Sequence, residues 1–385
     1  MTPGGGDILV TGATGFTGTA VLRALLARGA GPRVRVLARG PVPEWARAAG
    51  VRVHQGDLAD ASGLTGLCTG VSTLVHLAVR ITGTAGDCAA VNEHGTARLL
   101  AEAHRAGTRR IVHQSTCAVY RDGEHRAAPE PRAPAWFSGR PGARVPAAPG
   151  AASISAPAGG TAGQKVRGGA APGVARAACP VADVSGGPGK RAALEVGPES
   201  AASRSRLAGE RLVLSSGGIV LRPHLVYGEG DQHVVPALVR WLRAVPAWAG
   251  GGVARTSIVA LPDLASVITA FALDAGAGRP GEVFHVADPR PVRMRTLTGA
   301  VCGLLGLPLP AKDLSLDEHR ARTRAALPWL TEHQWSLLTR DHWYASDRVW
   351  AVTGVPPGPG LPVRLAEAAG WYRKTLGTED RIRRP

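Results

Sequence analysis

The apolar residues near the start of the chain follow two different periods in succession. Residues 8–10 form a short apolar run with β-branched members. A segment with apolar side chains at helical spacing follows over residues 19–28: Val21, Leu22, Leu25 and Leu26. A second short apolar run occupies residues 34–37. This order predicts a strand, a helix over residues 19–28 and a second strand, which together form a βαβ unit.

Glycines join the predicted strand to the predicted helix. Residues 11–18 read TGATGFTG, with no spacer on either side. In a dinucleotide site Gly12 permits the tight turn, Gly15 lets the backbone approach a pyrophosphate, and Gly18 lets the helix pack closely on the strand. The helix N-terminus offers free N–H groups and a partial positive charge to the phosphates. We therefore predict a dinucleotide cofactor that is bound here by Gly12, Thr14, Gly15, Phe16, Thr17 and Gly18.

The end of the second strand indicates which dinucleotide is bound. An NAD site usually places a carboxylate there to accept from the ribose 2′-hydroxyl, whereas a 2′-phosphate favours a nearby arginine. This chain has Ala38 and Arg39 at that place. We therefore predict NADP(H), although Arg39 could instead be one surface arginine of an arginine-rich chain.

Short apolar runs and helical segments continue to alternate along the chain. Further strands are predicted at residues 51–54, 72–78 and 110–113, and a helix at residues 91–103. Strands that alternate with helices are typical of a parallel sheet with helices on both faces. We therefore predict an α/β fold with a Rossmann-like, doubly wound parallel sheet.

A low-complexity stretch interrupts this pattern. Residues 127–200 consist largely of Ala, Gly, Pro and Ser with scattered Arg and have almost no apolar periodicity, which predicts a disordered or loosely packed insertion. A lid over the site and a reading-frame error in the gene are alternatives that the sequence leaves open. The expected organisation is an NADP-binding part (1–126), the insertion (127–200), a return to the Rossmann core (201–233) and a smaller, mainly substrate-binding C-terminal region that also holds late core elements (234–385).

Composition bears on the surroundings and partners of the protein. The net charge of +16 would suggest nucleic acid, but the chain has only four lysines and its arginines are scattered, so we expect no nucleic-acid partner. Five cysteines form no CxxC pair and are odd in number, which fits reduced thiols in a cytosol. Residues 1–7 leave no room for a signal peptide, and no apolar run reaches the ~18 residues of a membrane span. We expect a cytoplasmic protein with a small-molecule substrate, no membrane contact and no metal, and leave a homodimer open.

Several motifs, in order, resemble those of the extended short-chain dehydrogenase/reductase family, which includes sugar-nucleotide epimerases and 3β-hydroxysteroid dehydrogenases. The matching blocks in the first part are TGATGFTG, GDL at 56–58, LVHLA at 74–78, VNEHGT at 91–96 and STCAVY at 115–120. The resemblance resumes with SRLAGE at 205–210 and LRPHLVYG at 221–228. It covers residues 7 to about 120 and 201 to about 375.

The resemblance implies cofactor contacts beyond the glycine segment. Asp57 and Leu58 would flank the adenine, and Leu77, Ala78 and Val79 would lie along the cofactor. Pro223 and His224 would border the nicotinamide. His76, Tyr120 and Tyr227 lie in or beside the same motifs, and we interpret them as packing residues.

The resemblance also implies a catalytic pair. Thr116 stands four residues before Tyr120, where the family has the Ser or Thr that hydrogen-bonds the substrate oxygen. The family's proton donor is a Tyr four residues before a Lys on one helix. Here Arg206 occupies the Lys position, where it would hold the ribose, and Ala202 occupies the Tyr position. Thr116 and Arg206 are therefore predicted to be catalytic, but the usual general acid is absent.

Hydride transfer could continue with another proton source, because general acid catalysis typically contributes ~10²–10⁴-fold. His224 or His113 could donate the proton. The substrate could instead carry an acidic hydroxyl beside its ketone, as in the simocyclinone-type angucyclinone ketoreductases, which this chain resembles in lacking the Tyr. As a third alternative, the protein could bind the cofactor without turning it over.

The leading hypothesis is an NADPH-dependent ketoreductase that reduces a ketone of a polycyclic aromatic polyketide in antibiotic biosynthesis. A sugar-nucleotide epimerase or dehydratase is the main alternative, weakened because that chemistry depends more strongly on the Tyr. A non-catalytic NADP-binding protein is another. Tryptophans of the C-terminal region could line a pocket for a planar ligand or pack in the core: Trp241, Trp248, Trp329, Trp335, Trp343, Trp350 and Trp371.

Overall fold

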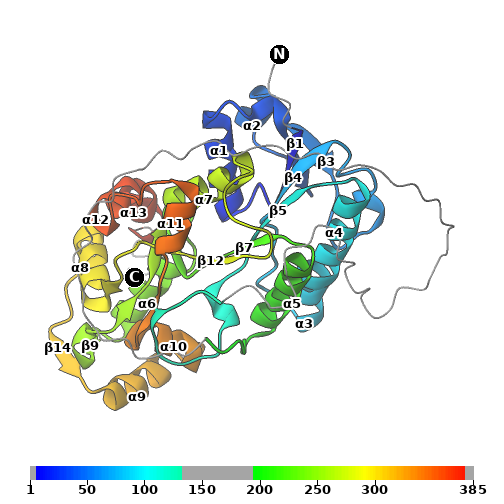
Figure 1. Ribbon diagram of the computed structural model, residues 1–385. Helices are drawn as coiled ribbons and strands as arrows, with labels where there is room; N and C mark the ends of the chain where they lie inside the picture. The colour runs from blue at the N-terminus through cyan, green and yellow to red at the C-terminus, as the bar shows by residue number, and fades with distance from the viewer. Residues whose placement is uncertain (1–5, 132–193, 378–385) are drawn as a thin grey trace, which may run out of the picture. The chain divides into compact units, whose positions relative to one another are not determined.

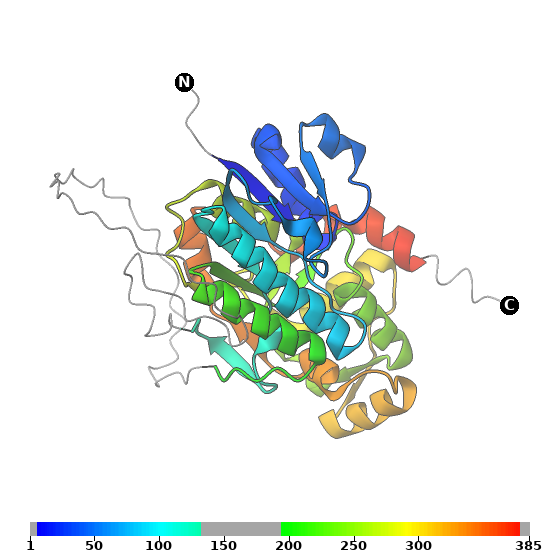
Figure 2. The same cartoon turned by 90° about the vertical axis from the view of Figure 1, so that its right-hand side faces the viewer.

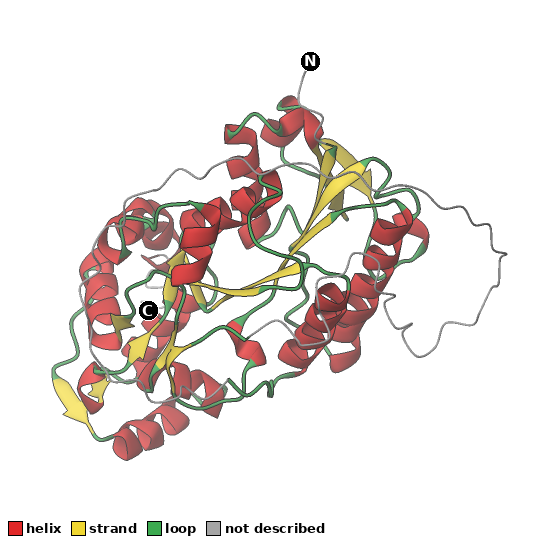
Figure 3. Ribbon diagram, in the orientation of Figure 1, coloured by secondary structure: helices red, strands yellow, loops and turns green. Residues whose placement is uncertain are grey.

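A computed structural model describes residues 6–131 and 194–377 of the chain. At its centre lies a sheet in which every pair of neighbouring strands is parallel (Figure 1 and Figure 3). From one edge to the other its strands are β12 (Val283–Val286), β7 (Ile219–Pro223), β5 (Arg110–Gln114), β4 (Val71–His76), β1 (Asp7–Thr11), β2 (Val34–Ala38) and β3 (Arg52–Gln55). The predicted doubly wound α/β fold is confirmed.

Helices cover both faces of this sheet (Figure 2). One face packs on α1 (Phe16–Ala27), α7 (Leu261–Leu273) and α11 (Asp347–Thr353). The other face packs on α4 (Thr96–Arg105) and α5 (Ala201–Ser215). The nucleotide-binding part also contains α2 (Glu44–Ala48), α3 (Ala85–Ala89) and a π-helical turn (Ala90–Gly95) that leads into α4.

The two-sided burial explains why the strands read as continuous apolar runs. Ile8 and Val10 of β1 belong to the core shared with α1 and α7, whereas Leu9 belongs to the core shared with α4 and α5. A strand buried on both faces needs apolar side chains in both alternating sets. The apolar run at residues 8–10 therefore marks a central strand.

The C-terminal region builds a separate core and also returns to the main sheet. Its helices are α6 (Val234–Ala244), α8 (Met294–Leu305), α9 (Leu316–Ala326), α10 (Glu332–Thr339), α12 (Leu361–Glu367) and α13 (Ala369–Gly377). Three small sheets accompany the main one. The first has four strands, in the order β13 (Val292–Arg293), β10 (Arg255–Thr256), β15 (His342–Tyr344) and β6 (His125–Ala128). The other two have two strands each: β11 (Ile258–Ala260) with β8 (Leu225–Tyr227), and β14 (Lys312–Leu314) with β9 (Ala247–Ala249). The chain between α6 and α11 also supplies β12 and α7 to the Rossmann core.

Two local findings differ from, or lie beyond, the sequence predictions. The first helix begins at Phe16 rather than at residue 19, because Gly15 is its N-cap and the end of the glycine segment is already helical. Most of the predicted insertion, residues 132–193, lies outside the described residues. At its described edges β6 pairs with β15, and Tyr120 forms an isolated bridge with Val196.

None of the described helices is both long and apolar enough to cross a bilayer.

Candidate active site

A pocket of about 890 Å³ lies where the carboxyl ends of the parallel strands meet. The strand order reverses between β1 and β4, and ligands of doubly wound sheets bind at such a reversal. The lining includes every residue predicted to bind the cofactor and both residues predicted to be catalytic: Gly12, Thr14, Gly15, Phe16, Thr17, Gly18, Arg39, Asp57, Leu58, Leu77, Ala78, Val79, Thr116, Arg206, Pro223 and His224. The structure thus brings these residues together, while their individual roles stay predictions.

The glycine segment forms a turn that only small residues can make. Gly12 has φ +70°, and a Cβ on it would lie 2.6 Å from the main-chain nitrogen of Ala78. A Cβ on Gly18 would lie 1.9 Å from the carbonyl oxygen of Gly12. Gly15 caps α1 without a side-chain acceptor, and the first turn has no acidic residue. No side chain of the cap or the first turn therefore neutralises the partial positive charge at the N-terminus of α1, which faces the pocket and can bind a pyrophosphate.

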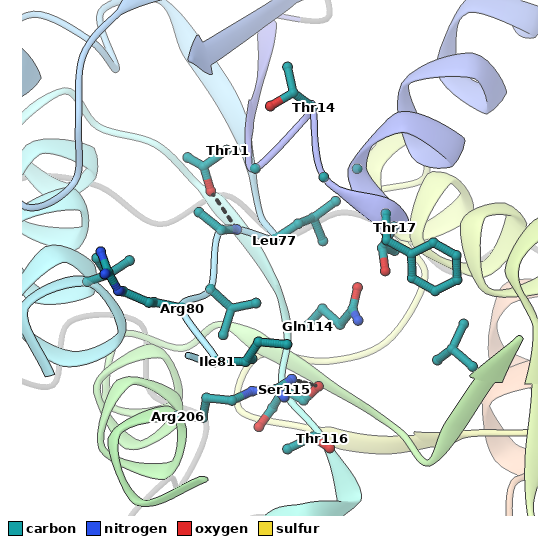
Figure 4. A pocket seen from close by; sticks show the side chains of 18 of the residues that line it. Thr11, Thr14, Thr17, Leu77, Arg80, Ile81, Gln114, Ser115, Thr116 and Arg206 are labelled. Atoms are coloured by element: carbon teal, nitrogen blue, oxygen red, sulfur yellow. Dashed lines mark hydrogen bonds between the residues drawn. The ribbon is translucent and has the colours of Figure 1, made fainter. Parts of the chain in front are cut away.

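A buried histidine fixes the neighbouring strand end against this turn. His76 Nε2 lies 2.9 Å from Thr96 Oγ1, whose own proton goes to the Asn92 carbonyl, so His76 donates from Nε2. His76 Nδ1 then accepts from Thr11 Oγ1 at 2.7 Å, and Thr11 accepts from the Ala78 N–H (Figure 4). Burial holds the pKa of His76 well below its usual value, with His113 adding to the shift. His76 is a neutral structural residue.

The ends of β2 and β3 carry opposite charges. Arg39 is 72% exposed, and its Nη1 lies 3.8 Å from Asp57 Oδ2, a loose contact that leaves the guanidinium accessible. Asp57 Oδ1 accepts from the Ala59 N–H and so shapes the turn after β3. The last residue of β2 is Ala38, so no carboxylate stands at the place where it would meet a ribose 2′-hydroxyl.

Thr116 and Arg206 reach the pocket from β5 and α5. Figure 4 shows both on the side of the pocket that also holds Gln114 and Ser115. Thr116 Oγ1 accepts from the Ala118 N–H at 3.2 Å, so the hydroxyl proton is left for another acceptor. Arg206 Nη2 donates to the Ser115 carbonyl at 2.7 Å. Burial lowers the pKa of Arg206 to about 10, against the opposing Glu210 carboxylate, so the side chain stays cationic at neutral pH.

No tyrosine reaches this pocket. All four tyrosines of the chain are described, and none of them belongs to the lining. Tyr120 is paired with His285, Tyr344 with His125, and Tyr372 donates to Asp231. Burial raises the pKa of all four phenols, the opposite of what a tyrosine proton donor needs. None of the four tyrosines is therefore placed to act as the general acid in this pocket.

The two histidines considered as proton donors differ in position. His113 is buried, stacks on His76 with 4.8 Å between ring centroids, and lies 3.0 Å through Nδ1 from the His76 carbonyl. It does not line the pocket, and burial lowers its pKa to about 4. His224 does line the pocket, directly after β7. The structure therefore leaves only His224 of this pair in place to meet a substrate.

The sequence analysis missed Gln114 and Ser115 in the pocket lining and Asn92 beside it. Asn92 Nδ2 donates to Ser205 Oγ and to the Arg80 carbonyl, and its Oδ1 accepts from the Arg80 N–H, so it joins the loop after β4 to α5. Gln114 Oε1 and Ser115 Oγ are buried without hydrogen-bond partners in the pocket wall. Asn92 lay within the quoted VNEHGT motif, but its partner is more than a hundred residues away in sequence. No local pattern marks that contact.

The C-terminal tryptophans are not part of this pocket. Trp241, Trp248, Trp335 and Trp350 are buried, and Trp329 is 52% exposed. None of the seven appears in the pocket lining. Most of them therefore pack the core of their region, which was one of the two uses expected for them.

Comparison with known proteins agrees with this geometry. Residues 8–135 match the NAD dependent epimerase/dehydratase family. A stretch of 111 residues is 40% identical to sterol demethylase protein B of Methylococcus capsulatus, covering 28% of this chain and 34% of that protein. The chain is 26% identical over 336 residues to the 2-alkyl-3-oxoalkanoate reductase of Stenotrophomonas maltophilia, covering 86% and 84% of the two chains.

Two further similarities cover most of the chain. A 4-hydroxy-2-methyl-3-oxo-4-farnesyl-3,4-dihydroquinoline-1-oxide ketoreductase of Stigmatella aurantiaca is 25% identical over 343 residues, 86% of this chain and 80% of that protein. The crystal structure of the dTDP-glucose 4,6-dehydratase DesIV of Streptomyces venezuelae, solved with NAD bound, has a TM-score of 0.60 at 19% identity and covers 97% and 98% of the two chains. The fold, the ordered motifs and these similarities agree with the resemblance to the extended short-chain dehydrogenase/reductases, and residues 8–135 match a family of NAD-dependent enzymes.

Proposed function

We propose that this protein is an NADPH-dependent ketoreductase that reduces a ketone of a polycyclic aromatic substrate in antibiotic biosynthesis. The observation that carries the proposal is the composition of one pocket. It joins the open N-terminus of α1 and the Arg39 cation at one end to Thr116 and Arg206 at the other. A phosphate-binding end and a carbonyl-polarising end are the two parts that such a reductase needs.

The preference for NADPH over NADH rests on the end of β2. Arg39 can reach a ribose 2′-phosphate because its side chain is largely exposed and only loosely paired with Asp57. The matching carboxylate of an NAD site is replaced by Ala38. Fluorescence titration of the purified full chain with NADPH and NADH tests this preference. Tighter binding of NADPH is expected, and equal affinities would contradict it.

The residues at the other end of the pocket act on the substrate oxygen. When bound, the cofactor supplies the hydride. Thr116 can donate a hydrogen bond to the carbonyl oxygen, because Oγ1 already accepts from the Ala118 N–H and its own O–H is left for another acceptor. Arg206 uses one donor on the Ser115 carbonyl and keeps others for the ribose. Its positive charge also stabilises the alkoxide that forms.

The substrate class is supported by relatives and by the missing tyrosine. The two relatives that span most of the chain are named for the reduction of a 3-oxoalkanoate and of a quinoline-oxide ketone. A substrate hydroxyl next to the ketone is one proton source in the absence of a tyrosine, and an aromatic polyketide provides such groups. A pair of quinoid ketones that differ only in a peri hydroxyl, assayed by NADPH oxidation, tests this source. Equal rates would exclude it.

Two other results would contradict the ketoreductase. Binding of a nucleoside diphosphate sugar in calorimetry would favour an epimerase or dehydratase. Binding of NADPH without reduction of any ketone would favour a non-catalytic NADP-binding protein.

A further inference from the structure

His224 is an unpaired histidine in the wall of the candidate active site. It follows Pro223 at the end of β7 and lines the same pocket as Thr116 and Arg206. Neither of its ring nitrogens has a hydrogen-bond partner among the described residues, and Nε2 is buried. Nδ1 is not among the buried unpartnered atoms, so it is the ring nitrogen that a ligand in this pocket can reach.

Two aromatic neighbours of His224, His342 and Tyr344, have hydrogen-bond partners of their own. The His224 ring stacks on His342 with 6.0 Å between centroids and lies 5.2 Å from Tyr344. His342 Nε2 is paired with Ser336 Oγ at 3.0 Å, and the Tyr344 hydroxyl with His125 at 2.9 Å. The aromatic wall therefore fixes the ring of His224 without using its nitrogens.

Burial keeps His224 neutral. The pKa of His224 lies well below its usual value because the ring is desolvated, and the nearby rings of His342, His125, His333 and His285 add to the shift. Its ring carries a single N–H at neutral pH. A neutral imidazole whose pKa is lowered in this way can polarise a carbonyl.

We propose that His224 donates the proton that a tyrosine supplies elsewhere in this family. This inference rests on the proposed ketoreductase function. When bound, NADPH would supply a hydride to the ketone carbon and become NADP⁺, so that the ketone oxygen would carry the negative charge of an alkoxide. The His224 Nδ1–H bond breaks as the new O–H bond forms, and the resulting imidazolate takes a proton from solvent after the alcohol leaves. Thr116 holds the same oxygen, and the Arg206 cation stabilises the negative charge on either partner.

Replacement of His224 in the full chain tests this assignment, with a quinoid ketone that lacks a peri hydroxyl so that the substrate cannot supply the proton. His224→Ala should lower kcat by ~10²–10⁴-fold, the usual contribution of a general acid. The affinity for NADPH, measured by fluorescence, should change little. Added imidazole should restore part of the lost rate, which a purely structural role of His224 would not allow.

His333→Gln is a matched control. His333 belongs to the same group of histidines, but its side chain is 29% exposed and it lies outside the pocket lining. This variant should keep the kcat of the unaltered chain. A comparable loss of kcat in both variants would show that disturbance of the histidine group, not removal of the donor, is responsible.

A second readout does not depend on turnover. In ¹⁵N NMR of protein with labelled imidazole rings, His224 should remain neutral at pH 7 with its proton on Nδ1. A cationic His224, or a proton on Nε2, would overturn the assignment. If the unaltered chain reduces the ketone and His224→Ala does so equally fast, the assignment is wrong while the proposed function stands. If the unaltered chain binds NADPH and reduces no ketone, both are wrong.

Discussion

Arg206 on α5 donates from Nη2 to the main-chain carbonyl of Ser115 at the end of β5, over 2.7 Å. This hydrogen bond joins the helix on which the family resemblance places a tyrosine and a lysine to the segment after β5 that carries Thr116. It uses one of the five N–H donors of the guanidinium. The hydrogen bond holds Arg206 at the pocket and leaves other guanidinium donors for a ligand, and Ala202, one turn earlier on α5, has no proton to give.

Gly18→Ala should damage the cofactor site directly. The new Cβ would fall 1.9 Å from the Gly12 carbonyl oxygen, so the turn has to move away from its phosphate-binding geometry. We expect NADPH affinity to fall at least about tenfold and the free energy of unfolding to fall by about 1–3 kcal/mol. Gly303→Ala is the control, because Gly303 lies in α8 with open space around it. That variant should gain about 0.5–1 kcal/mol. Unchanged NADPH binding by Gly18→Ala would contradict the glycine-turn assignment.

Arg39→Ala should separate the two nicotinamide cofactors. Loss of a charge-assisted contact to the 2′-phosphate should weaken NADPH binding by about 10- to 100-fold, whereas NADH affinity should hardly change. Arg47→Ala removes an exposed arginine of the neighbouring α2, outside the pocket lining, and should affect neither cofactor. If Arg39→Ala weakens NADPH and NADH equally, Arg39 does not select the 2′-phosphate.

Thr116→Val and Thr116→Ser should behave differently. Valine keeps the shape but removes the hydroxyl that polarises the carbonyl, so kcat should fall by about 10²–10³-fold. Serine keeps both this donor and the acceptor for the Ala118 N–H, and should retain most of the activity. Valine also removes the acceptor for the Ala118 N–H, so the melting temperature of each variant should be measured to show whether a loss of activity comes from a loss of stability. A serine variant as slow as the valine variant would argue against the hydroxyl.

Buried histidines should make the fold sensitive to mild acid. Burial lowers the pKa of His113 and His342 to about 4 and that of His285 to about 3, against about 6.5 in an unfolded chain. As pH falls below about 6.5, these histidines become protonated in the unfolded state but stay neutral in the folded state. The free energy of unfolding therefore decreases down to about pH 4. Each such histidine should cost about 2 kcal/mol at pH 5. Denaturant unfolding at pH 7 and pH 5 measures this difference, and equal stability at both values would contradict it.

The nucleotide-binding half could be predicted because its signals are local. The apolar run at 8–10 and the glycines that follow determine a central strand and a turn within a few residues. Parallel strands place their carboxyl ends along one edge of the sheet, so the residues after β1, β3, β4, β5 and β7 meet in one pocket. The start of α1 was misplaced because Gly18 was assigned to the turn, whereas the absence of its side chain allows the helix to begin against Gly12.

The surroundings of the catalytic end could not be predicted, since they depend on contacts between distant segments. His342 and Tyr344 reach His224 from β15, which follows it by more than a hundred residues and pairs with β6 from the first part of the chain. The burial of most C-terminal tryptophans is likewise set by the packing of α6, α10 and α11. Nothing in the spacing of these residues distinguishes a core tryptophan from one that lines a pocket.

Deuterium transfer tests the central claim most directly. The purified full chain is incubated with NADPH deuterated at C4 of the nicotinamide and a quinoid ketone, and the product is examined by mass spectrometry and NMR. We predict an alcohol with one deuterium on the carbinol carbon, formed in step with NADPH oxidation. Tight binding of the cofactor with no labelled alcohol from any ketone tested would contradict the assignment of this protein as a ketoreductase.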